Sequence, residues 1–432
     1  MPGRPPPPDA DAAPRLRAIL ARNLAGERVG LTSLCTAHPE AITAGVEAAR
    51  DAGQTALVEA TCNQVNQEGG YTGLTPAAFA EGVRRQARAI GLPAGALALG
   101  GDHLGPQPWR DRSAAEAMVW ACDMVRAYAE AGFAKLHLDA SMPCADDPSP
   151  LPEETVAARA ARLARAAEET GARPLYVVGT EVPAPGGMGE GHALAVTRPE
   201  AVAATWEAHR AAFATAGLEA AWERVGAVVV QPGLDFGNEG VVPFDPRAAR
   251  ALSEEARRLG VAFEAHSTDY QRPAAYPALV EGHFAILKVG PALTFALREA
   301  LYALEAAEAE LLPPPRRSGL RAALEAAMLA QPRHWERHYP DPERAAWQRH
   351  FAFSDRLRYY WAAPGVAAAA KRLSGSLAGR DIPLPILHQI LPREAERVAE
   401  GRLAPRHPDL LRAHVRAAVE PYLAASLPHA AP

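Results

Sequence analysis

Asp102 and His103 place a carboxylate next to an imidazole in the segment GGDHLGP at residues 100–106. They come at the end of a short apolar run, 96–100, so both side chains are expected where a strand stops and a loop begins. Such a pair can supply a metal ligand beside a group that moves protons. One dipeptide is weak support, and its weight comes from similar residues at the ends of other apolar runs.

Six further apolar runs carry or precede residues of the same chemical kinds. These residues are Glu59, Asn63 and Gln64 for the second run, Asp139 and Ser141 for the fourth, Glu181 for the fifth, Gln231 for the sixth, His266 for the seventh, and Lys288 and Gly290 for the eighth. The carboxylates and imidazoles suit metal binding and proton transfer, and the neutral amides of Asn63 and Gln64 suit recognition of hydroxyl groups. The amides could equally hold the turn before Gly69.

Positioning these residues requires eight parallel strands. The apolar, β-branched-rich runs are 29–34, 55–59, 96–100, 135–138, 174–178, 226–230, 261–264 and 284–289, and helical stretches such as 114–131 and 155–170 separate them. This alternation predicts an α/β fold, a (β/α)8 TIM barrel whose strand ends converge on one mouth. A doubly wound open sheet is the alternative.

Prolines mark the expected division of the chain. Residues 1–13 are predicted to be a disordered, proline-rich tail, and residues 14–312 the barrel. Pro313-Pro314-Pro315 begins a helical extension, 313–432, expected to pack on the barrel. Within it, the segment 354–361 combines Arg356 and Arg358 with three aromatic residues, which favours packing over a phosphate or subunit contact.

Composition narrows the class of protein. The chain has 432 residues, 48% of them hydrophobic, which is enough for a large core, and its net charge of −5 gives no basic surface for nucleic acid. An apolar run of about 18 residues, as a membrane span needs, is not found. Four cysteines without paired spacing suit a reducing cytoplasm. A cytoplasmic protein with no nucleic-acid or membrane partner is predicted.

Several long motifs resemble one known family. They are VEATCNQVNQ at 58–67, GGYTG at 69–73, GGDHLGP at 100–106, LHLDASM at 136–142, EAHSTDYQ at 264–271, residues 286–299 and FSDRLRYYW at 353–361. They look like the Z-subunit family of class II tagatose-bisphosphate aldolase, over about residues 20–392. The resemblance implies either a partner subunit that stabilises and activates a catalytic aldolase subunit, or a metal-dependent ketose 4-epimerase.

The resemblance also implies roles for individual residues. His103 and His266 fall where class II aldolases place metal-binding imidazoles, and Asp102 where they place a proton-transfer carboxylate. Gln231 stands where an aldolase has a ligand histidine, a departure that puts ordinary aldolase activity in doubt, and Glu181 or Gln231 is expected to complete the metal shell. The ion is divalent, with Zn, Mn, Ni and Mg not distinguished.

Chemistry favours one route for an epimerase. The C4 proton of a 2-ketose is not acidified by the carbonyl, so cleavage and re-formation of the C3–C4 bond is preferred to direct proton abstraction. This route needs a Lewis acid and carboxylates, which Asp102, Asp139 and Glu59 are predicted to supply. A Schiff base on Lys135 or Lys288 is the rival mechanism, although Lys288 is more simply expected to contact a substrate oxygen or a carboxylate.

The sequence-based prediction is therefore an isomerase. It is a metal-dependent 4-epimerase interconverting tagatose and fructose or their 6-phosphates, with the non-catalytic aldolase subunit as the alternative. Substrate contacts are assigned to Asn63, Gln64, Ser141, Lys288 and Gly290. The expected partners are a sugar or sugar phosphate, a class II aldolase catalytic subunit, and further copies of the chain in a homo-oligomer.

Overall fold

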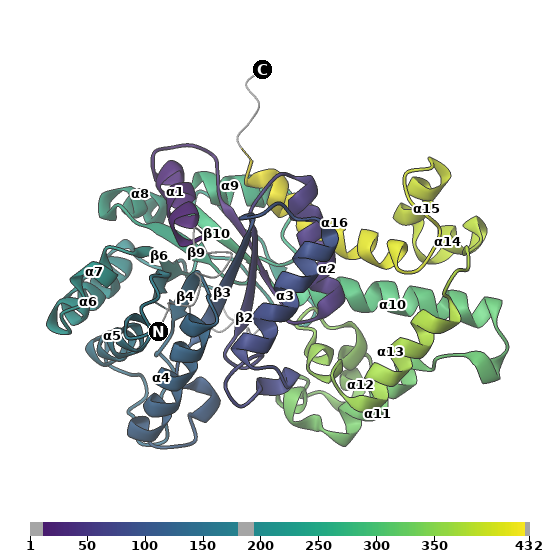
Figure 1. Cartoon of the computed structure of the whole chain (residues 1–432), viewed down its shortest axis with the longest axis horizontal. Coiled ribbons are helices and arrows are strands. Elements are labelled where there is room, and N and C mark those ends of the chain that lie inside the picture. The colour runs from purple at the N-terminus through teal and green to yellow at the C-terminus, as the bar shows by residue number, and fades with distance from the viewer. Residues whose placement is uncertain (1–11, 180–193, 428–432) are drawn as a thin grey trace, which may run out of the picture.

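A closed barrel of eight parallel strands forms the centre of the protein (Figure 1). The computed structural model describes residues 12–179 and 194–427. Around the barrel the strands are ordered β1-β10-β9-β6-β5-β4-β3-β2. Their bounds are β1 Leu31–Cys35, β2 Ala56–Thr61, β3 Leu97–Leu104, β4 Lys135–Leu138, β5 Leu175–Val178, β6 Val225–Val230, β9 Ala262–Ala265 and β10 Phe284–Val289. The predicted (β/α)8 barrel is confirmed, and the open sheet is not formed.

All eight apolar runs become barrel strands, because an apolar run of four to six residues can be buried on both faces of a parallel sheet. A separate two-stranded antiparallel sheet, β7 (Asp235–Phe236) and β8 (Val241–Val242), lies after β6. The α-helices are α1 Ala12–Leu24, α2 Pro39–Asp51, α3 Pro76–Ile90, α4 Ala114–Glu130, α5 Glu153–Glu168, α6 Pro199–Thr215, α7 Glu219–Trp222, α8 Arg250–Leu259, α9 Ala275–Glu281, α10 Pro291–Leu311, α11 Leu320–Ala330, α12 Pro342–Phe351, α13 Pro364–Ser376, α14 Leu384–Ile390, α15 Pro392–Ala399 and α16 Asp409–Ala425.

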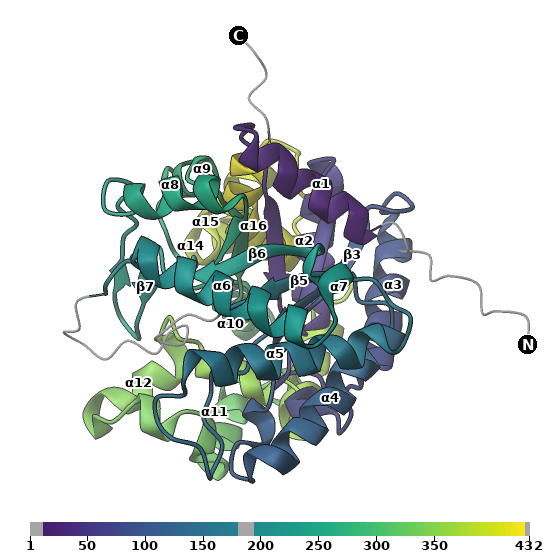
Figure 2. The ribbon, with the colours of Figure 1, turned by 90° about the vertical axis from the view of Figure 1, so that its left-hand side faces the viewer.

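Helix α1 closes the amino-terminal end of the barrel (Figure 2). Its buried Leu16 and Leu20 pack in a cluster with residues of the barrel strands, among them Leu31, Leu57 and Ala98. This cluster is apolar, so the barrel is filled and dry at this end, and the polar residues are restricted to the layers above it. Ala12 and Ala13, which the predicted tail included, are buried residues of α1, and residues 1–11 lie outside the described part.

The carboxyl-terminal region both leaves the barrel and returns to it. Helix α10 follows β10 and extends away from the barrel toward α11 and α13 (Figure 1). Helix α16 then packs against α2, α9 and β1, which places it in the outer ring of helices. In its last turns the Tyr422 hydroxyl donates a hydrogen bond of 2.8 Å to the Thr268 carbonyl oxygen beyond β9. The domain boundary expected at Pro313 stays a prediction. Part of the expected helical extension, helix α16, completes the outer ring of helices around the barrel.

Short 3₁₀ helices connect several of these elements. They are η1 Gly70–Thr72, η2 Gln107–Trp109, η3 Pro314–Arg316, η4 Pro332–His334, η5 Glu336–His338 and η6 Arg356–Tyr360. Within the described residues, helices long and apolar enough for a membrane crossing are absent.

Candidate functional site at the carboxyl-terminal mouth of the barrel

Polar side chains fill the upper half of the barrel because strand residues alternate between the interior and the helices. In β4, Leu136 and Leu138 belong to the apolar core, whereas Lys135 and His137 form ion pairs and hydrogen bonds with residues of other strands. Glu264 in β9 and His266 directly after β9 are likewise two residues apart. Each of these two strands therefore contributes one residue to a middle layer and one to the mouth above it.

The middle layer is a buried network of ion pairs. The Lys135 ammonium lies 2.8 Å from a Glu59 carboxylate oxygen and 2.6 Å from one of Glu264. The Lys288 ammonium contacts Glu59, and lies 2.9 Å from Asp102 and 3.7 Å from Glu264. Burying these charges requires such pairing, since an unpaired charge is very costly in a dry interior.

Glycine makes room for this layer. A Cβ atom at Gly100 would lie 2.7 Å from Cγ of Glu59, so a larger residue would push that side chain out of the network. At the mouth, a Cβ at Gly105 would lie 1.6 Å from the Asp139 carbonyl oxygen. Gly100 and Gly105 of the GGDHLGP motif thus allow β3 and its loop to approach Glu59 and Asp139.

The ion pairs set the charge states of the site. Burial favours the neutral form, but Lys288 and the three neighbouring histidines together outweigh it and hold the pKa of Asp102 well below its usual range. For Lys288, burial is outweighed by Asp102, Glu59 and Glu264, and its pKa is raised well above the ordinary value. Asp102 is therefore a paired anion, and Lys288 a cation too firmly protonated to act as an amine nucleophile.

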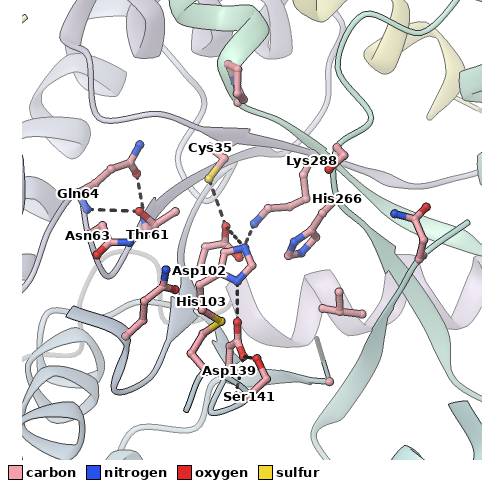
Figure 3. Close-up of a pocket in the computed structure, with 18 of the residues that line it drawn as sticks. Cys35, Thr61, Asn63, Gln64, Asp102, His103, Asp139, Ser141, His266 and Lys288 are labelled. Atoms are coloured by element: carbon pink, nitrogen blue, oxygen red, sulfur yellow. Dashed lines mark hydrogen bonds and ion pairs between the residues drawn. The ribbon is translucent and has the colours of Figure 1, made fainter. Parts of the chain in front are cut away.

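Three imidazoles meet above this layer. The ring centres of His103 and His137 are 4.9 Å apart, those of His103 and His266 4.8 Å, and those of His137 and His266 5.4 Å. Figure 3 shows His103 and His266 turned toward Asp102 and Lys288. His103 has a φ of 48°, a strained value for a residue other than glycine, so the backbone is held in an uncommon shape at this ring.

One nitrogen of each ring is held by an acceptor. Nδ1 of His103 lies 2.8 Å from Asp139, Nε2 of His137 2.9 Å from the Gly179 carbonyl, and Nε2 of His266 2.8 Å from Glu264. A carbonyl or ionised carboxylate can only accept, so these nitrogens carry the protons. The proton positions are thereby inferred from the partners. The second nitrogen of His137 accepts a hydrogen bond of 3.2 Å from the His103 backbone N–H and lies 3.0 Å from Asp102, so a cation bound there would replace these contacts.

This arrangement fits a divalent cation. Asp102, His103, His137 and His266 each offer a ligand atom, and these atoms lie within 4.8 Å of one another. Nitrogen and oxygen donors suit Zn²⁺ and similar ions, and the acceptors behind the rings fix tautomer and orientation as they do at metal centres. Asp102 and the three histidines thus supply enough ligand atoms for a divalent cation without Glu181 or Gln231.

A cavity of about 1410 Å³ opens over the imidazoles. Of the predicted residues, it is lined by Asn63, Gln64, Asp102, His103, Asp139, Ser141, Gln231, His266, Lys288 and Gly290. These side chains therefore meet at one mouth of the barrel, as the predicted fold requires. Glu59 does not line the cavity and is buried in the layer below, where Lys135 and Lys288 neutralise it. Glu181 lies outside the described residues.

Several predicted contacts are already satisfied within the protein. The Gln231 side-chain oxygen, the atom able to bind a metal, accepts hydrogen bonds from the backbone of Gly233 at 2.7 Å and Leu234 at 3.1 Å. It therefore holds the turn after β6. The Gln64 side-chain oxygen similarly accepts from the Thr61 backbone at 2.9 Å, and Ser141 donates to Asp139 at 2.6 Å.

The residues that sequence reasoning missed are His137, Glu264 and the pairing role of Lys135. From the sequence, His137 is only part of a strand, yet it supplies the third imidazole. A signal was present, because Lys135, His137 and Asp139 recur at the strand period of two and so share the barrel interior. The spacing of Glu264 and His266 carries the same signal.

Fold and site together define a (β/α)8 barrel with a group of imidazoles at its mouth that fits a divalent cation. Residues 16–427 match the family described as D-tagatose-1,6-bisphosphate aldolase subunit GatZ/KbaZ-like. The chain belongs to this family, as its motifs indicated.

Relatives and a solved structure agree over nearly the whole length. The D-tagatose-1,6-bisphosphate aldolase subunit GatZ of Klebsiella pneumoniae is 48% identical over 398 residues, which cover 90% of this chain and 93% of the relative. The subunit of the same name from Salmonella newport is 46% identical over 403 residues, covering 92% and 95%. A crystal structure from Sinorhizobium meliloti, named a probable tagatose 6 phosphate kinase, is 48% identical with a TM-score of 0.86 and covers 92% of this chain and 100% of that one.

These relatives correct one prediction. The assignment as a carbohydrate epimerase is wrong, since homologues at 46–48% identity are named as aldolase subunits and not as isomerases. The site offers a physical reason. Lys288 neutralises the Asp102 carboxylate that was expected to move the proton, and Glu59 lies below the cavity.

Proposed function

We propose that the protein is a subunit of D-tagatose-1,6-bisphosphate aldolase, working with a separate catalytic chain. The observation that carries the proposal is the match over residues 16–427, together with 46–48% identity to subunits of that name across at least 90% of this chain. Similarity of this extent includes the barrel mouth and the carboxyl-terminal helices, so it is not restricted to a shared fold.

We further propose that the mouth binds a tagatose phosphate and a divalent cation. The names of the relatives and of the Sinorhizobium protein all refer to tagatose phosphates, although they differ in the reaction. Asp102, His103, His137 and His266 would hold the cation. When bound, such an ion supplies Lewis acidity toward the oxygens of a ketose. The exposed Asn63 side chain at the rim is placed to contact sugar hydroxyls.

Co-expression with the tagatose-bisphosphate aldolase catalytic chain of the same organism tests the function. We expect the two chains to co-purify through size-exclusion chromatography, and the catalytic chain to show higher aldolase activity or a longer half-life with its partner than alone. A fructose-bisphosphate aldolase chain of similar size serves as the control partner. Failure to co-elute at micromolar concentration, with no change in activity or half-life, would rule out the subunit role.

A further inference from the structure

Two partly buried arginines line the cavity on the side supplied by the carboxyl-terminal region. Arg356 and Arg358 belong to η6, and both line the same cavity as Asp102 and His103. Neither guanidinium has a carboxylate within 4.0 Å in the described part of the chain. The sequence alone favoured packing for this segment, and packing does not explain two unpaired charges.

The two side chains are held differently. Nη1 of Arg358 donates to the backbone carbonyl oxygens of Ser354 and, at 2.9 Å, Asp355, while Nη2 donates to the Tyr359 hydroxyl at 3.2 Å. These bonds fix its orientation. Nε of Arg356 is buried and has no hydrogen-bond partner. A buried donor without a partner costs free energy, which a bound acceptor would recover.

Nearby acids are committed elsewhere. The Asp355 carboxylate accepts from Thr294 at 2.6 Å and lies 3.6 Å from Nε of Arg298. Asp269 accepts from the backbone of Gly290 at 3.0 Å and Ala292 at 2.9 Å, and burial raises its pKa to about 6. Asp269 thus occupies the start of α10, where a helix could otherwise receive a phosphate.

The positive charges of Arg356 and Arg358 shift the pKa values of neighbouring groups. Burial and then the charges of Arg356 and Arg358 lower the pKa of His338 to about 4. For Tyr359, burial is outweighed by Arg358 and Arg356, and the pKa falls below its ordinary value. Burial, together with the like charge of Arg358, lowers the pKa of Arg356 itself. The wall of the cavity at η6 is therefore suited to an anion.

We propose that Arg356, Arg358 and the Tyr359 hydroxyl between them form a dianion subsite that takes a phosphate group of the sugar ligand. This inference rests on the proposed function, because it assigns one end of a tagatose phosphate to η6 and the other end to the mouth. Guanidinium groups bind phosphate oxygens through charge-assisted hydrogen bonds, and the planar fork can contact two oxygens at once. The carboxyl-terminal region then completes the ligand site instead of only covering the barrel.

Titration calorimetry on the full-length chain, without its partner, tests the subsite. The probes are inorganic phosphate, tagatose 1,6-bisphosphate and unphosphorylated tagatose. Arg356→Gln should weaken binding of the phosphorylated probes by about tenfold or more, the usual order for one charge-assisted contact, and leave free tagatose unchanged. Arg356→Lys keeps the charge and should lie between wild type and Arg356→Gln. Arg337→Gln, an exposed neighbour outside the cavity, removes the same charge and should bind like wild type.

The alternatives give different results. Equal affinities for the phosphorylated probes in wild type and Arg356→Gln would overturn the subsite. Equal weakening in Arg337→Gln would also overturn it, because it would show that any nearby positive charge attracts the phosphate. Circular dichroism melting of Arg356→Gln within about 2 °C of wild type confirms that the variant is folded; if it is not, the comparison of Arg356→Lys with wild type decides. Co-elution with the catalytic chain tests the proposed function separately, so either can fail alone.

Discussion

At the centre of the barrel, the ammonium group of Lys288 lies among three carboxylates, those of Glu59, Asp102 and Glu264. It is one of only three lysines in the chain, and the only lysine or arginine contacting Asp102 within the described residues. Removing the Lys288 ammonium would leave three buried carboxylates, with Lys135 as the remaining ammonium in the network. We therefore expect both the stability of the fold and the geometry of the mouth to change.

Lys288→Met is expected to lower the free energy of unfolding by about 3–5 kcal/mol, because breaking one side of a buried ion pair leaves uncompensated charge. Urea denaturation followed by circular dichroism measures the change. Lys371→Met, at an exposed position of α13, should change stability by less than about 0.5 kcal/mol. A loss below about 1 kcal/mol for Lys288→Met would show that the network carries little stability.

The imidazoles lead to a second expectation at this scale. Adding Zn²⁺ or Mn²⁺ to metal-stripped protein at about 100 times the dissociation constant should raise the melting temperature by about 3 °C, since binding only to the folded state stabilises it. In His103→Gln and His266→Gln the shift should disappear. The exposed His388→Gln serves as the control for loss of a histidine. An identical shift in all three variants would place the ion elsewhere.

At the scale of elements, three helices of the carboxyl-terminal region meet at one histidine. His414 in α16 lies 3.1 Å from Glu394 of α15 and 3.4 Å from Glu299 of α10. Burial alone would lower its pKa, but the hydrogen bonds to Glu299 and Glu394 outweigh burial and raise it to about 9. The charged imidazole therefore holds α16 to both helices near neutral pH.

This contact should make stability depend on pH. The pKa of His414 is higher in the folded chain than its ordinary 6.5, so the folded state binds the proton more tightly. The stabilisation is full below about pH 6.5 and is lost as the pH rises toward 9. Because the side chain is partly exposed, we expect about 1–2 kcal/mol. His414→Gln should lack this part of the decline when denaturation is compared at about pH 6 and about pH 9, and an unchanged decline would contradict the assignment.

At the scale of the whole molecule, α16 links the end of the chain to its beginning. It packs on α2 and β1, and Tyr422 reaches the backbone beyond β9. Helix α10, which follows the last strand, points instead toward the carboxyl-terminal helices (Figure 1). The outer ring is therefore complete only when a segment more than 100 residues after β10 has returned to it.

A chain ending at Leu312 is accordingly expected not to fold as an independent barrel. Losing α16 exposes the apolar faces of α2 and β1, and part of the core cluster is removed with it. Thermal melting should show no cooperative transition for this truncation, whereas a chain ending at Leu427 should melt like the full-length protein. A cooperative transition within a few degrees of wild type would instead support an independent domain.

The order of strands and the gathering of Asp102, His103 and His266 at one mouth could be predicted from the sequence. The strand bounds were predicted to within a residue or two, except that β3 continues to Leu104 and so includes Asp102 and His103, which were expected in the loop after it. The physical reason is local, because the apolar runs and the strand period of two depend on residues close together in the sequence, and eight such strand–helix units are typical of a closed barrel. The family could be predicted for the same reason, since its motifs lie at the strand ends.

Pairings between distant segments were decided only by the tertiary structure. His137 as the third imidazole, Gln231 as a turn residue, Glu59 below the cavity and the arginines of η6 at its wall all depend on which side chains meet across the barrel. An ionisable group takes its charge state and its role from such neighbours, and separations of up to about 230 residues, as between Glu59 and Lys288, leave no trace in local sequence. The types of residue at the site are thus a property of the sequence, and their roles a property of the folded chain.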